Sequence, residues 1–268
     1  MDPEAKRPTG AKANTAIIPR IPQDIIDEIL DHLAADPVEL TSLRSCSLVS
    51  KSWILPCQQR LFYAVTFTSG DMERWLNTFP VPEESPALHV RDLSVWIGGS
   101  SRVTEDFFGH TVLFTNVKKM TIFGQGGMPP IRPTFWKLPR SITTFTFRAS
   151  GVTLVKIRDI MAQLPNLDDL SLFGSPILVD RSALLGIGTA LGGRFGGQLA
   201  LNGGWVDKDV INMLLEVPTR LHFTEVHICA TRGCLPPAVR LAGACSKTIV
   251  KLSYWVILHG KSHPCLSD

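Results

Sequence analysis

The sequence predicts an α/β repeat fold, in which a short helical module at the N-terminus is followed by an irregular solenoid of parallel strands and outer helices. Two observations predict it. Short segments of the form apolar-x-x-apolar-x-apolar recur about every 26 residues from residue 62 onward. Several of the segments between them carry apolar residues at helical spacing. The 268 residues are enough for a small module and a larger domain.

The composition excludes several classes of protein. The net charge is only +3 and no dense Lys/Arg run is present, so nucleic acid is not an expected partner. No apolar run approaches the roughly 20 residues that span a bilayer, and residues 1–20 lack the apolar core of a secretory signal. We therefore expect no membrane contact and a location in the cytoplasm or the nucleus. The 6 cysteines form no C-x-x-C pairs, which favours free thiols.

The N-terminal module begins after a tail. Residues 1–17 are polar, small and contain Pro and Gly, which predicts disorder. The stretch "IPQDIIDEILDHLAAD" then predicts an amphipathic helix, because Pro22 suits its first position and acidic residues lie near its N-terminal end. Its apolar residues at helical spacing are Ile25, Ile26, Ile29, Leu30 and Leu33.

Two further short helices are expected after this one. Asp36 and Pro37 end the first helix, and the second runs through Leu40 and Leu43. The stretch "CSLVSKSW", residues 46–53, is then expected to be helical, with one face formed by Cys46, Val49 and Trp53. Leu48, Ile54 and Leu55 add apolar surface, which is more than helices totalling about 35 residues can hide among themselves. Another surface should cover part of it.

The segment "IPQDIIDEILDHL" followed by "LRSCSLVSKSW" resembles the F-box, whose pattern is a Leu-Pro-like start, an amphipathic helix and a Val-x-x-x-Trp ending. Ile21 stands where leucine is usual, and Val49 and Trp53 have the family's spacing. The resemblance covers residues 18–62, and "LFYAVTF" resembles the segment that follows the box in fungal members. It implies a three-helix module that docks on a Skp-type adaptor, which bridges to a cullin in a ubiquitin ligase. The adaptor-binding residues that it implies are Ile21, Pro22, Ile25, Ile29, Leu48, Val49, Trp53 and Leu55. The alternative is a helical cap that only closes the end of the larger domain.

Residues 63–268 are predicted to form a repeat domain of about eight strands with a period of about 26 residues. Each copy alternates apolar and polar residues, as a half-buried strand does. The predicted segments are 62–67, 90–95, 117–122, 142–147, 167–172, 196–201, 223–228 and 249–254. Their central apolar residues are Val65, Leu93, Met120, Phe145, Leu170, Leu199, Val226 and Leu252.

Helices are predicted between some of these strands. The apolar sets at helical spacing begin at Met72, Ile157, Leu184 and Ala238. The connection 124–140 has too much Pro and Gly for a helix and should be an extended loop. This alternation of a strand with a helix that leads back to the next strand resembles a leucine-rich repeat. The Asn that usually follows the strand is missing from most copies. A doubly wound α/β sheet is the alternative, and the short, even strands and the lack of a phosphate-binding turn favour the solenoid.

Residues with reactive side chains give no convincing site. Of the late Cys and His residues, only His227 with Cys229 and His263 with Cys265 approach the spacing of zinc ligands, so no metal is expected. The glycine-rich stretch 186–197 fits neither phosphate-binding motif. Cys46 lies on the expected core face with only His32 in its module, which favours a buried thiol. We therefore expect no catalytic residue, no cofactor and no enzyme.

The outward positions of the strands form columns if the strands are in register. The column three residues after the central position is Trp96, Phe123, Arg148, Phe173, Asn202, Cys229 and Trp255. Aromatic and Arg side chains are the usual anchors of protein interfaces, so the candidate substrate-binding residues are Trp96, Phe123, Arg148, Phe173 and Trp255. Alternatively, these side chains fill the edge of the solenoid under the loops.

The periodicity divides the chain into a short module and a repeat domain, and the F-box resemblance implies that the chain is a substrate receptor of a Skp-cullin-F-box ubiquitin ligase. The F-box would bind the adaptor and the repeat domain would bind an unknown target protein. A non-ligase interaction scaffold with the same two parts is the alternative. An enzyme would need an acid/base pair hidden in the irregular repeats.

Overall fold

The computed structural model of the chain describes residues 21–98, 101–124, 137–149, 154–174, 196–202, 208–215, 221–230 and 235–256. The chain divides into two compact units, Met1–Cys57 and Gln58–Asp268, which we call the helical unit and the repeat unit. The division falls inside a helix, before the boundary expected after residue 62. The predicted tail 1–17 lies outside the described residues. In the described part, every helix is too short or too polar to cross a membrane.

The N-terminal elements are three α-helices, α1 (Gln23–Ala35), α2 (Leu40–Cys46) and α3 (Lys51–Leu61). Helix α1 begins directly after Pro22, whose fixed φ suits the residue before a helix. It ends at Asp36, which is extended because Pro37 follows it. The Asp36 carboxylate accepts a hydrogen bond of 2.9 Å from the Val38 N–H. This starts the 3-10 turn (Pro37–Glu39) that leads into α2.

Residues 46–53 do not form one helix, so the predicted shared helical face of Cys46, Val49 and Trp53 is wrong. Helix α2 ends at Cys46, residues 47–49 form a turn, and α3 begins at Lys51. Serine hydroxyls explain the break, because they compete for backbone groups. Ser47 Oγ donates to the Arg44 carbonyl at 2.6 Å, and Ser50 Oγ accepts from the Ser52 N–H at 3.3 Å. As a result Cys46 is half-buried, not part of the core, and Val49 is exposed.

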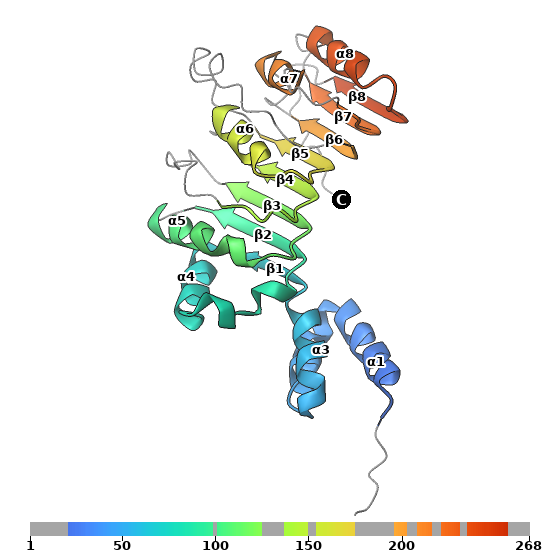
Figure 1. Ribbon diagram of the computed structural model, residues 1–268. Coiled ribbons are helices and arrows are strands. Elements are labelled where there is room, and N and C mark those ends of the chain that lie inside the picture. Colours follow the sequence, from blue (N-terminus) through green and yellow to red (C-terminus); the bar gives the residue numbers. More distant parts are fainter. Residues whose placement is uncertain are drawn as a thin grey trace, which may run out of the picture. The chain divides into compact units, whose positions relative to one another are not determined.

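In the described residues of the repeat unit, eight strands form one parallel sheet in sequential order (Figure 1). Each strand starts two residues into its predicted segment, as β5 does at Asp169 in the segment 167–172. All eight predicted strands are therefore confirmed. The sequential order has no reversal point, so the doubly wound alternative is wrong. The strands are β1 (Ala64–Phe67), β2 (Asp92–Ile97), β3 (Lys119–Gly124), β4 (Thr144–Arg148), β5 (Asp169–Phe173), β6 (Gln198–Asn202), β7 (Glu225–Ala230) and β8 (Lys251–Val256).

The register of the sheet is the one that the sequence pattern predicts. The central apolar residues pair strand to strand, from Val65 with Leu93 to Val226 with Leu252. From β2 to β7 these side chains are fully buried, whereas Leu252 on the edge strand is 52% exposed. One buried column of apolar side chains therefore runs through the sheet and ends at β8.

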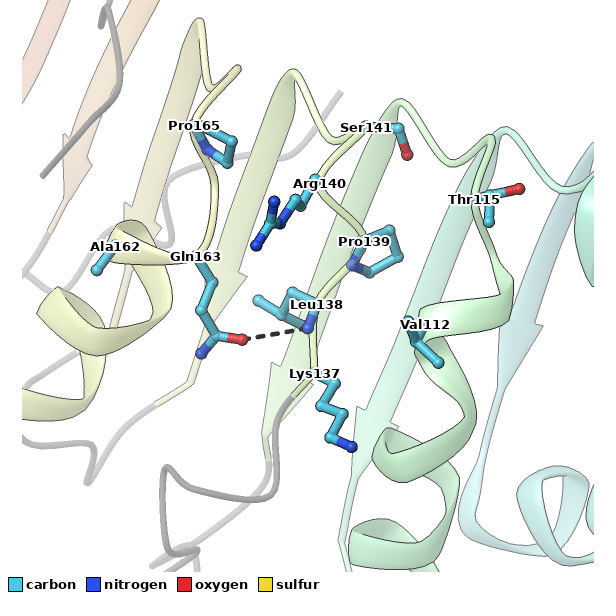
Figure 2. Close-up of a pocket in the computed structure, with 10 residues that line it drawn as sticks. All are labelled: Val112, Thr115, Lys137, Leu138, Pro139, Arg140, Ser141, Ala162, Gln163 and Pro165. Atoms are coloured by element: carbon cyan, nitrogen blue, oxygen red, sulfur yellow. Dashed lines mark hydrogen bonds between the residues drawn. The ribbon is translucent and has the colours of Figure 1, made fainter.

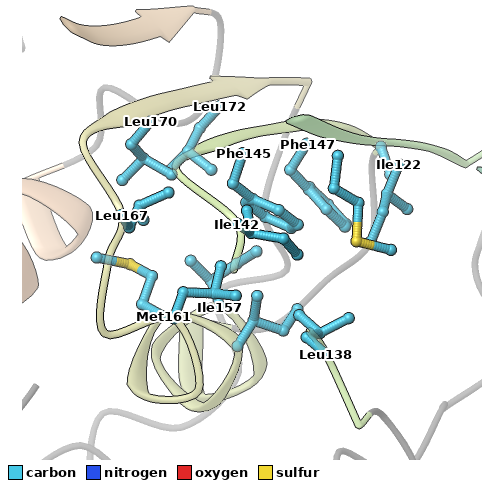
Figure 3. Close-up of a cluster of buried hydrophobic side chains, with 14 of the residues drawn as sticks. Ile122, Leu138, Ile142, Phe145, Phe147, Ile157, Met161, Leu167, Leu170 and Leu172 are labelled. Carbon is cyan, nitrogen blue, oxygen red and sulfur yellow. The ribbon is translucent and has the colours of Figure 1, made fainter. Parts of the chain in front are cut away.

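Helices cover one face of this sheet (Figure 1). They are α4 (Ser69–Thr78), α5 (Ser101–His110), α6 (Leu154–Ala162), α7 (Lys208–Leu215) and α8 (Leu235–Ala244). The predictions of α4, α6 and α8 are confirmed, α5 and α7 were not predicted, and the predicted helix around 184–191 lies outside the described residues. In Figure 3 the core between α6 and strands β4 and β5 contains Ile157, Met161, Phe145 and Leu170. Burying a side chain of this size contributes about 1.5–3 kcal/mol.

Short polar side chains link each repeat to the one before it. Four residues before the central apolar position, several copies carry a donor that reaches a carbonyl of the preceding repeat. The bonds run from Asn116 Nδ2 to Leu88 O (2.8 Å), Ser141 Oγ to Val117 O (2.7 Å), Asn166 Nδ2 to Arg140 O (2.9 Å) and Thr248 Oγ1 to Phe223 O (3.0 Å). These bonds satisfy carbonyls where the chain enters each strand. The role of this position was not predicted, although its recurring Asn, Ser and Thr are a detectable signal in the sequence.

Candidate functional site

The first candidate surface is the exposed apolar side chains of the helical unit. All of the residues that the F-box resemblance implies are exposed except Trp53, which is half-buried. Leu48 is 86% exposed and Val49 is 68% exposed, both in the turn between α2 and α3. A soluble domain rarely leaves several large aliphatic side chains uncovered within such a short segment. The exposed members are Ile21, Pro22, Ile25, Ile29, Leu48, Val49 and Leu55.

Helix α1 shows why this surface exists. Its apolar stripe is wider than the part that packs within the unit, because Ile26 and Leu30 are buried whereas Ile25 and Ile29 are exposed. Ile25 and Ile29 are four residues apart and so lie on one side of the helix. The sequence therefore encodes apolar side chains on α1 beyond those that its own core uses.

The second candidate surface is the sheet face that does not carry the helices. Its side chains form three rows across the strands, in the register that the strand pairing sets. The entry row is Asp92, Lys119, Thr144, Asp169, Gln198, Glu225 and Lys251; the hydroxyl row is Ser94, Thr121, Thr146, Ser171, Ala200, His227 and Ser253. The aromatic row is Trp96, Phe123, Arg148, Phe173, Asn202, Cys229 and Trp255.

Both lysines of the entry row are paired with carboxylates of the same row. Lys119 Nζ lies 3.0 Å from Asp92 Oδ2, and Lys251 Nζ lies 3.5 Å from Glu225 Oε2. Glu225 Oε2 also accepts a hydrogen bond of 3.3 Å from His227 Nε2. This hydrogen bond and the Lys251 charge lower the pKa of Glu225. Exposed pairs of this kind contribute little to stability, but they leave little net charge in this row for a ligand.

The aromatic row forms a stacked ladder across strands β2 to β5. The Trp96 and Phe123 rings stack with their centroids 4.4 Å apart and their planes 11° apart. The Arg148 guanidinium carbon lies 5.9 Å from the Phe123 centroid and 4.8 Å from the Phe173 centroid. Both distances are within the range of a cation–π contact. Trp96, Phe123, Arg148 and Phe173 are thus held together, and we call them the aromatic ladder.

The exposure of the ladder bears on the alternative that these side chains merely fill an edge. Arg148 is exposed, Trp96 is 37% exposed, and Phe123 and Phe173 are half-buried. Trp255 is exposed as well, but it lies apart on β8, where it stacks on His227 at 6.1 Å. The structure thus brings four of the five predicted residues together and leaves Trp255 outside the group.

A pocket of about 720 Å³ lies beside the segments that lead into strands of the repeat unit (Figure 2). Figure 2 shows the Gln163 amide turned toward the segment before β4, where its Oε1 accepts a hydrogen bond of 3.3 Å from the Leu138 N–H. Lys137 and Arg140 are exposed at its rim, and the other lining residues are mostly small or apolar. Sequence analysis did not find this pocket. The Pro-rich connection 124–140 is the signal that could have indicated it, although residues 125–136 lie outside the described part.

The side chains that could bind a metal or act as nucleophiles do not gather into a larger cluster in the described part of the chain. Among the described residues, no three His, Cys, Asp or Glu side chains are grouped so that they could hold a metal ion. Cys46 and Cys245 are free thiols, and burial raises the pKa of Cys245. A raised pKa reduces the reactive thiolate fraction. His263, Cys265 and most of the stretch 186–197 lie outside the described residues.

Comparison with known protein families found no matching family model, and comparison with curated proteins found no match.

Proposed function

We propose that the chain is the substrate-recognition subunit of a Skp-cullin-F-box ubiquitin ligase. In this proposal residues 18–62 are an F-box that binds a Skp-type adaptor, and through it a cullin. Residues 63–268 are a leucine-rich-repeat-like domain that binds a target protein. The chain carries out no bond chemistry itself and works where the adaptor and cullin are found, in the cytoplasm or the nucleus.

The observation that carries the proposal is the exposure of the apolar residues at the F-box positions. Ile25, Ile29, Leu48 and Val49 are all exposed in the helical unit. Burying such side chains against a partner yields about 25 cal/mol per Å² of apolar area. The order of elements also supports the proposal, because three helices follow one another where the F-box pattern would require them.

The open sheet face supports the second half of the proposal. In the repeat unit the helices cover one face of the sheet, and the other face presents the aromatic ladder. Aromatic and Arg side chains that are already fixed in place lose little entropy on binding. A target protein that docks on this face would meet a rigid surface.

The experiment is affinity purification of the tagged full chain from cells that contain the adaptor and the cullin. The wild-type chain is expected to retain both proteins, and Leu48→Asp is expected to lose both. Retention of the adaptor without the cullin would favour the alternative, a non-ligase interaction scaffold. If neither protein is retained by the wild-type chain, the helices serve only as a cap and the proposal is wrong.

A further inference from the structure

Arg148 lies on the sheet face that does not carry the helices, which we call the open sheet face. It differs from the other cations of this face in the partners of its charge. Lys119 and Lys251 are each paired with a carboxylate of the entry row. Within the described residues, no carboxylate lies within ion-pairing distance of the Arg148 guanidinium, whose contacts are the Phe123 and Phe173 rings. The acidic residues of the face are already engaged. Arg148 is therefore the unneutralised cation of this face among the described strands.

The two rings hold the guanidinium in place. Strands β3, β4 and β5 are adjacent, and the register pairs Phe123 with Arg148 and Arg148 with Phe173. Neighbouring strands lie about 4.8 Å apart, so the guanidinium comes between the two rings, 5.9 Å from the Phe123 centroid and 4.8 Å from the Phe173 centroid. An arginine held between rings is pre-organised and loses less rotamer entropy when it binds a ligand. Its N–H edge stays available, because Arg148 is exposed.

The chemistry of this group selects its ligand. A guanidinium presents parallel N–H donors that match the two oxygens of a carboxylate. A phosphate group carries nearly two negative charges and usually binds to a cluster of arginines. Lys119, another cation of the described part of this face, already forms an ion pair with Asp92 at 3.0 Å. One unpaired positive charge therefore complements a carboxylate better than it complements a phosphate.

The neighbouring rows indicate that the carboxylate belongs to a protein segment. Thr146 and Ser171 of the hydroxyl row lie on β4 and β5, two residues before the ladder residues of the same strands. Both are half-buried. Small hydroxyl side chains leave space for a backbone and offer it donors and acceptors. On the β3 side of Arg148, the stacked Trp96 and Phe123 rings add apolar surface that is partly exposed. The face thus has a place for an extended backbone, for one acidic side chain and for one apolar side chain.

We propose that Arg148 binds the carboxylate of an Asp or Glu side chain in an extended segment of the target protein, while the Trp96–Phe123 stack receives an apolar side chain of the same segment. This inference rests on the proposed function, because it assigns a recognition element to the target-binding face. It names an acidic protein segment as the occupant.

The test uses the purified full chain and an array of short peptides in which one position at a time is fixed as each amino acid, phosphoserine included. The wild-type chain is expected to select Asp or Glu at one position next to an apolar position. Arg148→Gln should weaken binding of the selected acidic peptides about tenfold, as expected for the loss of a charged hydrogen-bonded pair. Arg148→Lys keeps the charge but loses the fork and the stacking, so it should restore only part of the binding. Lys119→Gln is the matched control and should leave the acidic preference unchanged, since Lys119 is already paired.

Three results would overturn the inference. The first is a wild-type chain that selects no acidic residue, and the second is an acidic preference that Arg148→Gln retains. The third is a phosphoserine preference well above that for Glu, which would assign the site to a phosphorylated segment. Adaptor binding is measured separately in the affinity purification. An array that fails while the adaptor is retained therefore counts against this inference alone, and the reverse result counts against the proposed function.

Discussion

The Asp169 carboxylate occupies the space that a Cβ on Gly197 would need. The same carboxylate joins three consecutive strands. Its Oδ2 accepts a hydrogen bond of 3.1 Å from Thr144 Oγ1 on β4, and its Oδ1 accepts one of 2.7 Å from the Gln198 N–H on β6. Asp169 itself begins β5. The absence of a side chain at Gly197, directly before β6, therefore lets the Asp169 carboxylate reach the Gln198 N–H.

Gly197→Ala is expected to destabilise the chain by about 1–3 kcal/mol, because the methyl group displaces Asp169 and leaves the Gln198 N–H without its acceptor. The matched control is Gly243→Ala in α8, where a Cβ would meet nothing within 4 Å. That change should be neutral or add up to about 1 kcal/mol of stability. Denaturant unfolding midpoints measure both. Equal midpoints for the two variants would contradict this account of the β6 entry.

The buried column predicts a graded response to the same substitution. Leu170→Ala should cost about 2–5 kcal/mol, because it leaves a cavity at a fully buried site between packed strands. Leu252→Ala removes the same atoms at the equivalent position of the edge strand, where the side chain is 52% exposed. It should cost at most about 1 kcal/mol. Thermal unfolding of both variants tests the difference, and similar losses would show that the column does not end at β8.

The sequence pattern was sufficient to predict the sheet because strand burial depends on a simple alternation. The central residues from Val65 to Leu252 recur in register, and the structure pairs them as predicted. The aromatic ladder followed from the same register, since Trp96, Phe123, Arg148 and Phe173 occupy equivalent positions. The proposed adaptor-binding positions of the helical unit depended on a resemblance, and what the structure adds is the exposure of all of them except Trp53.

Other features depend on interactions that periodicity does not reveal. The break at residues 47–50 arises because Ser47 and Ser50 bond to nearby backbone groups, so a local hydrogen bond overrides helical spacing. Helix α5 escaped prediction because one of its buried positions at helical spacing is the polar Thr104, so Phe107 and Phe108 do not complete an apolar set. The contact of Gln163 with Leu138 joins residues 25 positions apart, and no local pattern indicates it.

Helix α4 is expected to lose stability in acid through its N-terminal cap. Asp71 Oδ2 accepts hydrogen bonds from the Thr68 hydroxyl at 2.7 Å and from the Thr68 N–H at 3.1 Å. The hydroxyl first, and then the N–H, lower the pKa of Asp71 below its ordinary value of 3.8. A carboxylate whose folded pKa is lowered stabilises the fold above the unfolded pKa, and this stabilisation is lost as the pH falls through the folded pKa.

The variant Asp71→Asn should therefore be less stable than wild type at neutral pH by about 0.5–1 kcal/mol, since the site is near the surface and belongs to a helix cap. This gap should shrink as the pH falls below about 4. Unfolding midpoints of the pair across that range measure it. In a Thr68→Ala background the neutral-pH gap should be smaller, because the hydroxyl donor is gone. A gap that stays constant down to low pH would show that the carboxylate does not act through the cap.

The exposed turn of the helical unit gives the most direct test of adaptor binding. Trp53→Ala should cost about 2–4 kcal/mol of binding, but Trp53 is half-buried, so its loss also disturbs the unit itself. Leu48 is 86% exposed and Val49 is 68% exposed, which makes them the better sites.

The double variant Leu48→Asp, Val49→Asp should weaken adaptor binding at least about tenfold, because a charge cannot be buried unpaired in an apolar interface. Its unfolding free energy should stay within about 0.5 kcal/mol of wild type, as expected for exposed positions. Val250→Asp is the matched control, since Val250 is also 86% exposed but belongs to the repeat unit. Titration of purified adaptor into each full-length variant gives the affinities. If the double variant and the control bind alike, the exposed turn is not part of the adaptor interface, and the apolar side chains of α1 would have to provide that interface alone.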